Sequence, residues 1–374
     1  MKFKRRILLK FGAAYYFNSL LKNPLYAHGV KNLTKPPMVK IALLGLGNYA
    51  ENWIAPAIAQ SEYAVLTSLI TGSPDKIPKR KKKYQIKDEN IYNYENLDHI
   101  IKNDSIDCVY IVTPTGTHSD FTIRSLKAKK HVICEKPMAS TVAECDQMIS
   151  VAKSANKSLQ IGYRLYWDPF NICLMEAMRT KKFGKLEGMQ GDFSYNQGSF
   201  HNKGKNDWRM NPKLNPGGAL FDIGVYVAQS AFYSSQMHPI SVTANHITNR
   251  PDIFKDIPEH WEWELTWPNN MKSQHYASYG RQANYIRLKT EKGRVEIDPA
   301  YSYEGLKGST PNGKMKYENI FQQKLQIDGQ CLAIRNRRAN ITSGEMGRRD
   351  VLLLNQIMKA ADTRTPIVLN DLFV

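Results

Sequence analysis

Between residues 39 and 162 the chain alternates short apolar runs with longer amphipathic stretches. Short apolar runs bounded by turn residues predict buried strands, and apolar positions at helical spacing predict helices. We expect strands at 39–45, 64–71, 107–112, 131–134 and 158–161, and helices at 49–60, 75–84, 118–129 and 141–156. Strands that are apolar throughout and alternate with helices indicate a parallel sheet covered on both faces. The pattern therefore predicts an α/β domain over residues 38–162, a doubly wound parallel sheet of the Rossmann type.

After residue 163 the pattern changes to longer helices and a series of extended segments. The predicted strands are at 239–247, 259–267, 272–280, 283–289 and 293–298, with another after Gly184 and helices at 168–182, 219–234 and 346–361. Successive strands without helices between them indicate an open, mainly antiparallel sheet. We therefore expect residues 163–374 to form an α+β domain that binds the substrate. The loop 196–218, rich in Gly, Asn and Pro, is expected at the rim of the cleft.

Residues 1–37 carry the features of an export signal followed by an N-terminal arm. The run from Lys4 to Lys10 is similar to a twin-arginine export motif, with paired arginines ahead of apolar residues. The apolar segment 11–21 is shorter than the roughly 18 to 20 residues that span a bilayer, as is every other apolar run of the chain. We expect a periplasmic or otherwise exported protein without a membrane span. The alternative is a basic, disordered tail on a cytoplasmic protein, and whether the segment is removed stays open.

The charge of the chain is unevenly distributed. The formal net charge is +18 at pH 7, and half of it lies in residues 1–40, which contain nine Lys and Arg and no acid. A second basic run, at 79–83, is typical of a solvated helix face. Because no zinc finger, RNA-binding motif or basic patch interleaved with aromatic residues accompanies it, we expect no nucleic-acid partner. The five cysteines are scattered and form neither a disulfide framework nor a zinc-binding pattern, so we expect no metal site.

The first predicted strand ends in a glycine-rich turn that leads directly into a helix. Gly45 allows a sharp turn, and Gly47 has no Cβ to block a pyrophosphate. Ala50, in the third position, is small enough for close packing of helix and strand. The first amide groups of the helix would face the phosphates. We expect a dinucleotide site formed here by Gly45, Leu46, Gly47, Asn48 and Tyr49.

The end of the second strand bears on the choice between NAD and NADP. An NAD site usually places Asp or Glu there, about 20 residues after the glycines, to bind the ribose 2′-hydroxyl. The strand instead ends in Thr71, Gly72 and Ser73, followed by Lys76. Hydroxyl groups and a lysine suit a 2′-phosphate, so the pattern favours NADP, with NAD possible because Asp75 lies nearby. The alternative is an ordinary turn with an exposed lysine.

Two further strand ends carry candidate chemistry. One closes a strand and opens a helix, and we expect there a loop beneath the nicotinamide ribose, formed by Pro114, Thr115, Thr117 and His118. His118 is alternatively only a residue of the first helical turn. The next strand ends in Glu135 and Lys136, a charged pair that is costly at the mouth of an apolar strand without a partner. We expect both at the cofactor, with Lys136 pointing into the cleft beside the nicotinamide.

With these strand ends in view, residues 38–374 resemble the glucose–fructose oxidoreductase/inositol dehydrogenase/rhizopine-catabolism (Gfo/Idh/MocA) family. The resemblance rests on the glycine turn, on Lys130-His131-Val132 followed by Glu135-Lys136-Pro137, on Ile161-Gly162-Tyr163-Arg164, on Trp208-Arg209 and on the segment 217–226. Thr115 departs from the Asn that the family often has, and Tyr226 from its commoner His. The twin-arginine segment, the pattern of Thr71, Ser73 and Lys76, and Tyr226 look most similar to the periplasmic glucose–fructose oxidoreductase branch and its aldose–aldose relatives.

The resemblance implies roles for residues and an assembly. Lys136, Asp222 and Tyr226 would be catalytic, and these three with Tyr163 would contact the substrate. Asp222 and Tyr226 are four residues apart, which places them on one face of a helix. The resemblance also implies a homo-oligomer, a dimer or tetramer, that associates through the C-terminal sheet. Further cofactor contacts would come from Arg164, Trp208, Arg209 and Tyr303.

These roles suggest a mechanism, which we state as a hypothesis. Tyr226 accepts the hydroxyl proton, Lys136 supplies the positive charge that favours the phenolate, and Asp222 positions substrate and lysine. The substrate would be a sugar or cyclic polyol, with an aldose oxidised at C1 to a lactone and a second sugar reduced on the same NADPH. An exported enzyme cannot draw on the cytoplasmic nucleotide pool, so we expect a tightly bound cofactor. The alternatives are a cofactor-releasing dehydrogenase, an exported NAD-dependent glycosidase and a non-catalytic sugar sensor.

Overall fold

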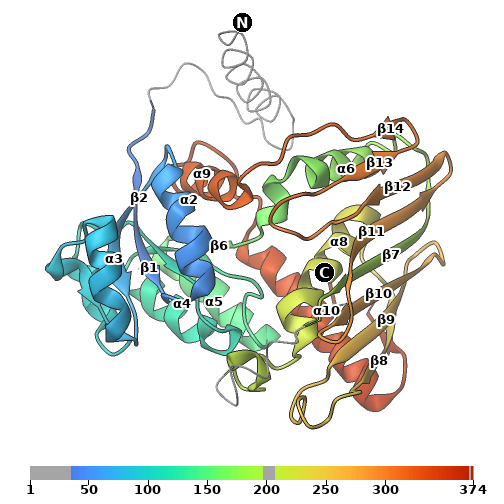
Figure 1. Ribbon diagram of the computed structural model, residues 1–374, viewed down its shortest axis with the longest axis horizontal. Coiled ribbons are helices and arrows are strands. Elements are labelled where there is room, and N and C mark those ends of the chain that lie inside the picture. Colours follow the sequence, from blue (N-terminus) through green and yellow to red (C-terminus); the bar gives the residue numbers. More distant parts are fainter. Residues whose placement is uncertain (1–34, 197–206, 370–371, 374) are drawn as a thin grey trace, which may run out of the picture.

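The computed structural model describes residues 35–196, 207–369 and 372–373. These residues form two domains side by side, one around each of two sheets (Figure 1). The export signal predicted for residues 1–37 lies almost wholly outside the described residues and stays a prediction. In the described part of the chain, no helix is both long and apolar enough to cross a membrane.

The first sheet is parallel throughout and has six strands in the order β3-β2-β1-β4-β5-β6. This is the strand order of the Rossmann fold, so the predicted doubly wound domain is confirmed. The order reverses between β1 and β4, where a ligand is expected outside the carboxyl ends of the strands. The strands are β1 (Val39–Leu44), β2 (Ala64–Ile70), β3 (Ile91–Tyr92), β4 (Cys108–Ile111), β5 (His131–Cys134) and β6 (Leu159–Ile161).

Helices cover both faces of this sheet because successive residues of a strand point to opposite sides. Ile41 and Leu43 of β1 belong to one buried cluster, with residues of α2 and α9. Ala42 and Leu44 belong to the other, with residues of α4 and α5. The helices of the first half are α2 (Ala55–Gln60), α3 (Ile77–Tyr84), α4 (His118–Lys127) and α5 (Val142–Ala155). Shorter helical turns are η1 (Ala50–Ile54), η2 (Pro74–Lys76), η3 (Asp88–Asn90), η4 (Leu97–Lys102) and η5 (Thr115–Thr117).

The second sheet has nine strands in the order β14-β13-β12-β11-β7-β10-β9-β8-β15. Among the described strands of this sheet, only β7 and β10 pair in parallel, so the predicted mainly antiparallel sheet is confirmed. The strands are β7 (Leu186–Ser194), β8 (Ser241–Ile247), β9 (His260–Thr266), β10 (Lys272–Ser278), β11 (Ala283–Thr290), β12 (Gly293–Ile297), β13 (Gly308–Thr310), β14 (Gly313–Lys314) and β15 (Ile367–Val368). Helices α8 (Val225–Ser235) and α10 (Gly344–Thr363) pack against it, and α6 (Pro169–Arg179) packs on α8. The remaining turns are η6 (Arg164–Trp167), η8 (Trp208–Met210) and η9 (Leu220–Gly224).

Helix α9 (Gln322–Ile334) was not predicted, and it connects the two halves of the molecule. It follows the second sheet in sequence, yet Ile327 and Cys331 lie in the core of the first domain. In Figure 1 it lies beside α2. Glutamines fall on several sides of α9, so no apolar stripe marks it in the sequence. They are buried nonetheless, because their amides have partners: Gln330 donates to the carbonyl oxygen of Ile161 at 2.8 Å.

Candidate active site

The glycine turn after β1 has the geometry that a dinucleotide site needs. Gly45 has a φ of +90°, and a Cβ there would lie 2.4 Å from the carbonyl oxygen of Val112 on the neighbouring strand end. Only glycine therefore fits this position. A Cβ on Gly47 would meet nothing within 4 Å, so this residue borders open space. The helical turn η1 begins three residues later, and the residues present thus fit a pyrophosphate.

A cavity of about 500 Å³ extends from this turn to the second domain. Its walls include most of the cofactor residues expected from the sequence, namely Gly45, Leu46, Gly47, Asn48, Tyr49, Thr71, Ser73, Lys76, Pro114, Thr115, Glu135, Lys136, Trp208, Arg209 and Tyr303. The catalytic candidates Asp222 and Tyr226 line the same cavity. The structure therefore brings the proposed cofactor turn and the proposed catalytic residues into one space.

Four residues expected at the cofactor do not line the cavity, and three of them, Gly72, Thr117 and His118, pack beside it. Gly72 lies against the ring of Tyr94, which a Cβ would approach to 2.7 Å. Thr117 donates to the carbonyl oxygen of Pro114 at 2.8 Å, which closes its own turn. His118 is buried as the first residue of α4, and burial lowers its pKa.

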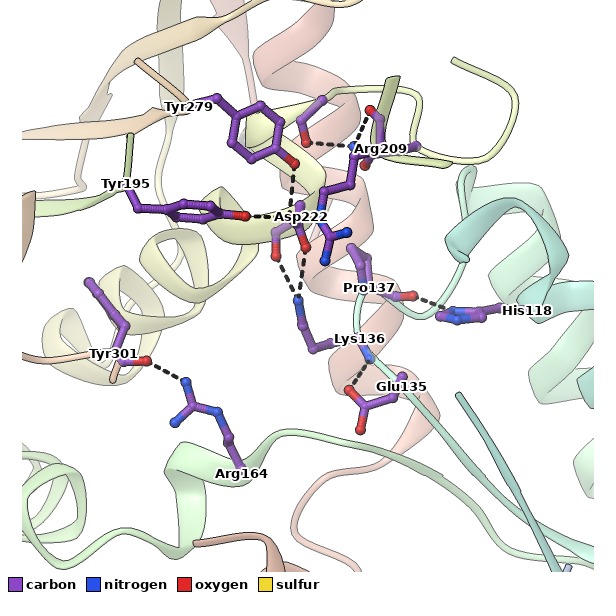
Figure 2. A network of polar contacts seen from close by, with 12 residues as sticks. His118, Glu135, Lys136, Pro137, Arg164, Tyr195, Arg209, Asp222, Tyr279 and Tyr301 are labelled. Carbon is purple, nitrogen blue, oxygen red and sulfur yellow. Dashed lines mark hydrogen bonds and ion pairs between the residues drawn. The ribbon is translucent and has the colours of Figure 1, made fainter. Parts of the chain in front are cut away.

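His118 has a structural position between two strand ends. One ring nitrogen lies 2.8 Å from the carbonyl oxygen of Pro137 (Figure 2), and the other lies 2.8 Å from that of Thr113. A neutral imidazole has only one N–H, so it donates to one of these two oxygens at a time. His118 therefore links the loop after β4 to the loop that carries Lys136, and the helix-residue alternative describes it better than a direct ribose contact.

Tyr163 and Arg164 lie behind the cavity wall. Tyr163 is buried and is not among the residues that line the cavity, and burial together with the charge of Asp350 raises its pKa well above the usual value. Arg164 is also buried and donates to the main-chain oxygens of Tyr301 and Ser302. Its guanidinium lies 5.0 Å from the ring centroid of Tyr226. Arg164 therefore packs against the ring of Tyr226 from behind the cavity wall.

Lys136 and Asp222 meet at the centre of the cavity (Figure 2). Lys136 follows β5, and its Nζ donates to the main-chain oxygen of Asp222 at 2.6 Å and lies 3.8 Å from Oδ1 of the same residue. The ammonium also lies 4.7 Å from the ring centroid of Tyr226. Asp222 belongs to the π-helical turn η9 and Tyr226 to the α-helix that continues it, so both lie on the wall that faces Lys136. One lysine thus contacts both other members of the predicted cluster.

Asp222 has additional partners that the sequence did not indicate. Its Oδ2 accepts hydrogen bonds from the Arg209 Nε at 3.0 Å, the Tyr195 hydroxyl at 3.1 Å and the Tyr279 hydroxyl at 2.9 Å. Burial alone would raise the pKa of this carboxyl, but the charges of Arg209 and Lys136 and the hydrogen bonds hold it below the usual value. Asp222 is therefore a carboxylate at neutral pH.

Glu135 is a buried carboxyl at the edge of the cavity. Its Oε1 accepts a hydrogen bond from the Tyr110 hydroxyl at 2.8 Å, and Tyr110 in turn accepts one from Gln326 of α9 at 2.7 Å. Burial raises the pKa of Glu135 to about 7, against the opposing charge of Lys136. Glu135 therefore changes its protonation near neutral pH.

The tip of β2 offers hydroxyl groups and a lysine to the cavity. Thr71, Ser73 and Lys76 line it, and none of the ion pairs within the described ranges involves Lys76. Arg80, one helical turn further on, pairs with Glu51 and donates to the main-chain oxygen of Lys76. The free ammonium at this tip is therefore that of Lys76.

Several lining residues were missed from the sequence. Trp53, Tyr94 and Asp207 line the cavity, and Trp53 packs on Tyr303 with ring centroids 4.4 Å apart. Asp207 directly precedes the Trp208-Arg209 pair, and its carboxylate lies 3.6 Å from Arg209. Tyr94 comes from a loop, where no periodicity marks a side chain as buried, whereas Trp53 lies within the predicted helix 49–60 and was not singled out. Within the described ranges, no group of three His, Cys, Asp or Glu side chains is arranged as a metal site.

Comparison with known proteins agrees with this architecture. The model of an oxidoreductase family with an NAD-binding Rossmann fold, Gfo/Idh/MocA, matches residues 39–163, and that of the Gfo/Idh/MocA C-terminal domain matches residues 173–298. The D-xylose 1-dehydrogenase [NADP(+)] of Haloarcula marismortui is 23% identical over 89% of this chain and 93% of its own. The myo-inositol 2-dehydrogenase of Thermotoga maritima is 30% identical over 39% of this chain and 42% of its own.

A solved structure is more similar over the whole chain. The crystal structure of the aldose–aldose oxidoreductase from Caulobacter crescentus, complexed with glycerol, has a TM-score of 0.83 and 33% sequence identity. It covers 88% of this chain and 99% of the solved chain. The two family models together match well over half of the sequence, in both domains. The chain belongs to the Gfo/Idh/MocA family of NAD(P)-dependent oxidoreductases.

Proposed function

We propose that this protein is an NADP-dependent sugar oxidoreductase that oxidises an aldose at C1 to a lactone and reduces a second sugar on the same, retained nucleotide. The observation that carries this proposal is the single cavity that joins the glycine turn, the lysine at the tip of β2 and the Lys136–Asp222–Tyr226 cluster. The 33% identity to an aldose–aldose oxidoreductase over most of both chains supports the coupled reaction.

The residues of the cavity divide into those that hold the nucleotide and those that act on the sugar. Gly45 and Gly47 would hold the pyrophosphate, and Lys76 with the hydroxyls of Thr71 and Ser73 would hold the 2′-phosphate. When bound, the nicotinamide would supply the hydride acceptor for the first sugar and the hydride donor for the second. Thr71, Gly72 and Ser73 follow β2 directly, so no carboxylate occupies the position from which an NAD site binds the ribose 2′-hydroxyl, and Asp75 is the nearest acid in the sequence.

Lys136, Asp222 and Tyr226 orient the sugar and transfer the proton of its hydroxyl group. The Asp222 carboxylate accepts a hydrogen bond from a sugar hydroxyl, which orients the reacting carbon. Lys136 places its positive charge over the Tyr226 ring and beside Asp222, so it stabilises negative charge on the phenolic oxygen and on the reacting alcohol oxygen. Tyr226 takes the C1 hydroxyl proton in oxidation and returns a proton when the second sugar is reduced.

The first test identifies the nucleotide and the reaction. The purified protein is denatured, the released nucleotide is identified by chromatography, and the native protein is then incubated with two aldoses and no added nucleotide. We expect NADP in near-equal amount to protein, and lactone and sugar alcohol in equal amounts. Protein without nucleotide that oxidises a sugar only with added NADP would instead support a cofactor-releasing dehydrogenase. That second candidate is favoured by the likeness to an NADP-dependent xylose dehydrogenase.

The second test concerns the proton acceptor. Tyr226→Phe keeps the ring beneath Lys136 but removes the hydroxyl, so we expect the turnover rate to fall by about 10²–10⁴-fold while nucleotide stays bound. Single-turnover reduction of the bound nucleotide measures the chemical step directly. Near-normal turnover of this variant with nucleotide present would contradict the assignment of Tyr226.

We also propose that the protein acts outside the cytoplasm as a homo-oligomer. Export is supported by the twin-arginine-like run, and association by the open face of the second sheet, where Gln190, Glu262 and Gln274 are exposed. Cell fractionation of the producing organism and light scattering of the purified protein test the two statements separately. A monomer in dilute solution would contradict the second one without touching the proposed reaction.

A further inference from the structure

The two oxygens of the Asp222 carboxylate have very different surroundings. Oδ2 accepts from three donors that come from three parts of the second domain: Tyr195 just after β7, Arg209 of η8, and Tyr279 just after β10 (Figure 2). Oδ1 has the Lys136 ammonium at 3.8 Å and, in the part of the chain that the structure describes, no hydrogen-bond donor. The protein thus occupies one oxygen and leaves the other available in the cavity.

The two tyrosines are held in place by their own packing. Tyr279 is fully buried, and its ring stacks on that of Phe254 at 6.1 Å. Its main-chain oxygen accepts a hydrogen bond from Arg250, which is paired with the buried Glu259. The ring of Tyr195 meets that of Tyr279 edge to face at 5.6 Å. The direction of both hydroxyl groups is therefore fixed before any substrate binds.

The chemistry of these hydroxyls makes them donors and not bases. A phenol donates a single hydrogen bond, and here the acceptor is a carboxylate. Burial and the negative charge of Asp222 raise the pKa of Tyr279 well above the usual value, so it keeps its proton. Tyr226 has different surroundings, with the cations of Lys136 and Arg164 against its ring.

We propose that Tyr195 and Tyr279 are positioning residues that hold Asp222 by Oδ2 and so present Oδ1 to the sugar hydroxyl beside Lys136. This inference rests on the proposed function, since it assigns the sugar to the site of Asp222. The sugar binds through the free oxygen, and the two tyrosines determine where that oxygen lies. Without them the carboxylate rotates toward Lys136 and Arg209, and the hydroxyl loses its acceptor.

The test uses the full-length protein with its bound nucleotide and the variants Tyr195→Phe, Tyr279→Phe and the double variant. Each keeps the ring and removes only the hydroxyl. Tyr276→Phe is the matched control, because Tyr276 lies on β10, shortly before Tyr279, and forms no hydrogen bond to Asp222 in the described residues. The other titratable or charged groups around Asp222 and its partner Lys136 stay unchanged in all variants: Glu135, Lys136, Asp207, Arg209, Tyr226 and Tyr303.

We expect kcat/KM for the donor sugar to fall about tenfold in each single variant and further in the double variant, mainly through KM, with nucleotide content unchanged. We also expect the acid limb of the kcat/KM profile to move to higher pH, because Asp222 loses donors that favour its ionised form. The pH profile of kcat/KM for Tyr276→Phe should superimpose on that of the parent. A merely structural loss of activity would lower kcat/KM without shifting the acid limb. Profiles of Tyr195→Phe and Tyr279→Phe whose acid limb coincides with that of the parent would therefore overturn the proposal.

A second measurement does not depend on turnover. Infrared titration, taken as the difference from Asp222→Asn, reports the protonation of the Asp222 carboxyl. It is measured in the parent and in Tyr195→Phe. Tyr195 is chosen because it is half-buried, so its substitution is less prone to folding defects than that of the buried Tyr279. A midpoint that rises in Tyr195→Phe supports the positioning role, and an unchanged midpoint overturns it. If the parent oxidises no aldose, the proposed function fails, and this titration still decides whether the tyrosines hold Asp222.

Discussion

At the scale of single residues, Glu135 links stability to pH. Its pKa is about 7 in the folded protein against an ordinary 4.5, because burial disfavours the charge. The folded state therefore holds a proton that the unfolded state has lost, and the parent loses stability as pH rises from 4.5 to 7, by about 3 kcal/mol. Glu135→Gln removes this slope, so its stability relative to the parent should increase by about that amount between pH 4.5 and 8.

Urea unfolding of nucleotide-free protein at the two pH values measures the difference. Glu95→Gln, at an exposed acid, serves as the control and should show no such change relative to the parent. A Glu135→Gln variant whose stability differs from the parent equally at both pH values would contradict the raised pKa.

Lys76 is the residue on which the choice of nucleotide depends. Its ammonium lies at the tip of β2 without an ion pair in the described residues, so Lys76→Ala should weaken NADP and leave NAD unchanged. A charge-assisted contact contributes about 1.5–3 kcal/mol, which corresponds to a loss of about tenfold or more in affinity. Calorimetric titration of the nucleotide-free protein with NADP and with NAD measures the two affinities. Lys82→Ala, on the exposed side of α3, is the control; equal weakening of NAD and NADP by Lys76→Ala would exclude a 2′-phosphate contact.

The sequence predicted residues of the site where a strand end fixes their place. Lys136 follows β5 and Gly47 follows β1, and both line the cavity as expected. The sequence could not distinguish a residue that lines the cavity from one that lies behind its wall. His118 and Tyr163 were therefore assigned to ligands, although His118 is buried between two loops and Tyr163 is buried in the core. It missed Tyr279 because its role arises only when the end of β10 meets the turn η9, far away in the chain.

At the scale of an element, the two glycines of the turn after β1 have different roles, Gly45 in folding and Gly47 in nucleotide binding. Gly45→Ala would force a Cβ against the Val112 oxygen at a positive φ, so it should cost the fold at least about 1–2 kcal/mol. Gly47→Ala meets no protein atom within 4 Å, so it should change stability by less than about 0.5 kcal/mol, yet place a methyl group where the pyrophosphate binds. Thermal unfolding and nucleotide content measure the two effects. A stable Gly47→Ala protein that keeps its full nucleotide would place the phosphates elsewhere.

Most elements were predictable because one periodicity dominates them. The buried strands β1 and β4 are apolar throughout, and α10 carries a continuous apolar stripe. The short strands β13–β15 offer too few residues for a pattern, and α9 is stabilised by buried amide contacts that a hydrophobicity pattern does not register. The π-helical starts of two predicted helices were also missed, since a single wider turn leaves the spacing nearly unchanged.

At the scale of the whole molecule, we expect α9 to make the two domains unfold together. One side of it belongs to the core of the first domain, and Gly329 on another side touches Trp167 of η6, whose ring a Cβ would approach to 2.0 Å. Gly329→Ala should therefore destabilise the protein by about 1–3 kcal/mol, and it should do so for both domains at once, because η6 also carries Arg164 and its contacts to the second domain.

Urea unfolding of the nucleotide-free Gly329→Ala variant, followed by circular dichroism and by tryptophan fluorescence, tests this coupling. Circular dichroism reports both domains, whereas five of the six tryptophans lie after residue 163. Gly188→Ala is the control, because its Cβ would find its nearest neighbour at 3.9 Å. If α9 is shared by both cores, the two signals shift together to lower urea concentration in Gly329→Ala. Separate midpoints would mean that each sheet keeps its own stability and that α9 only rests on the first one.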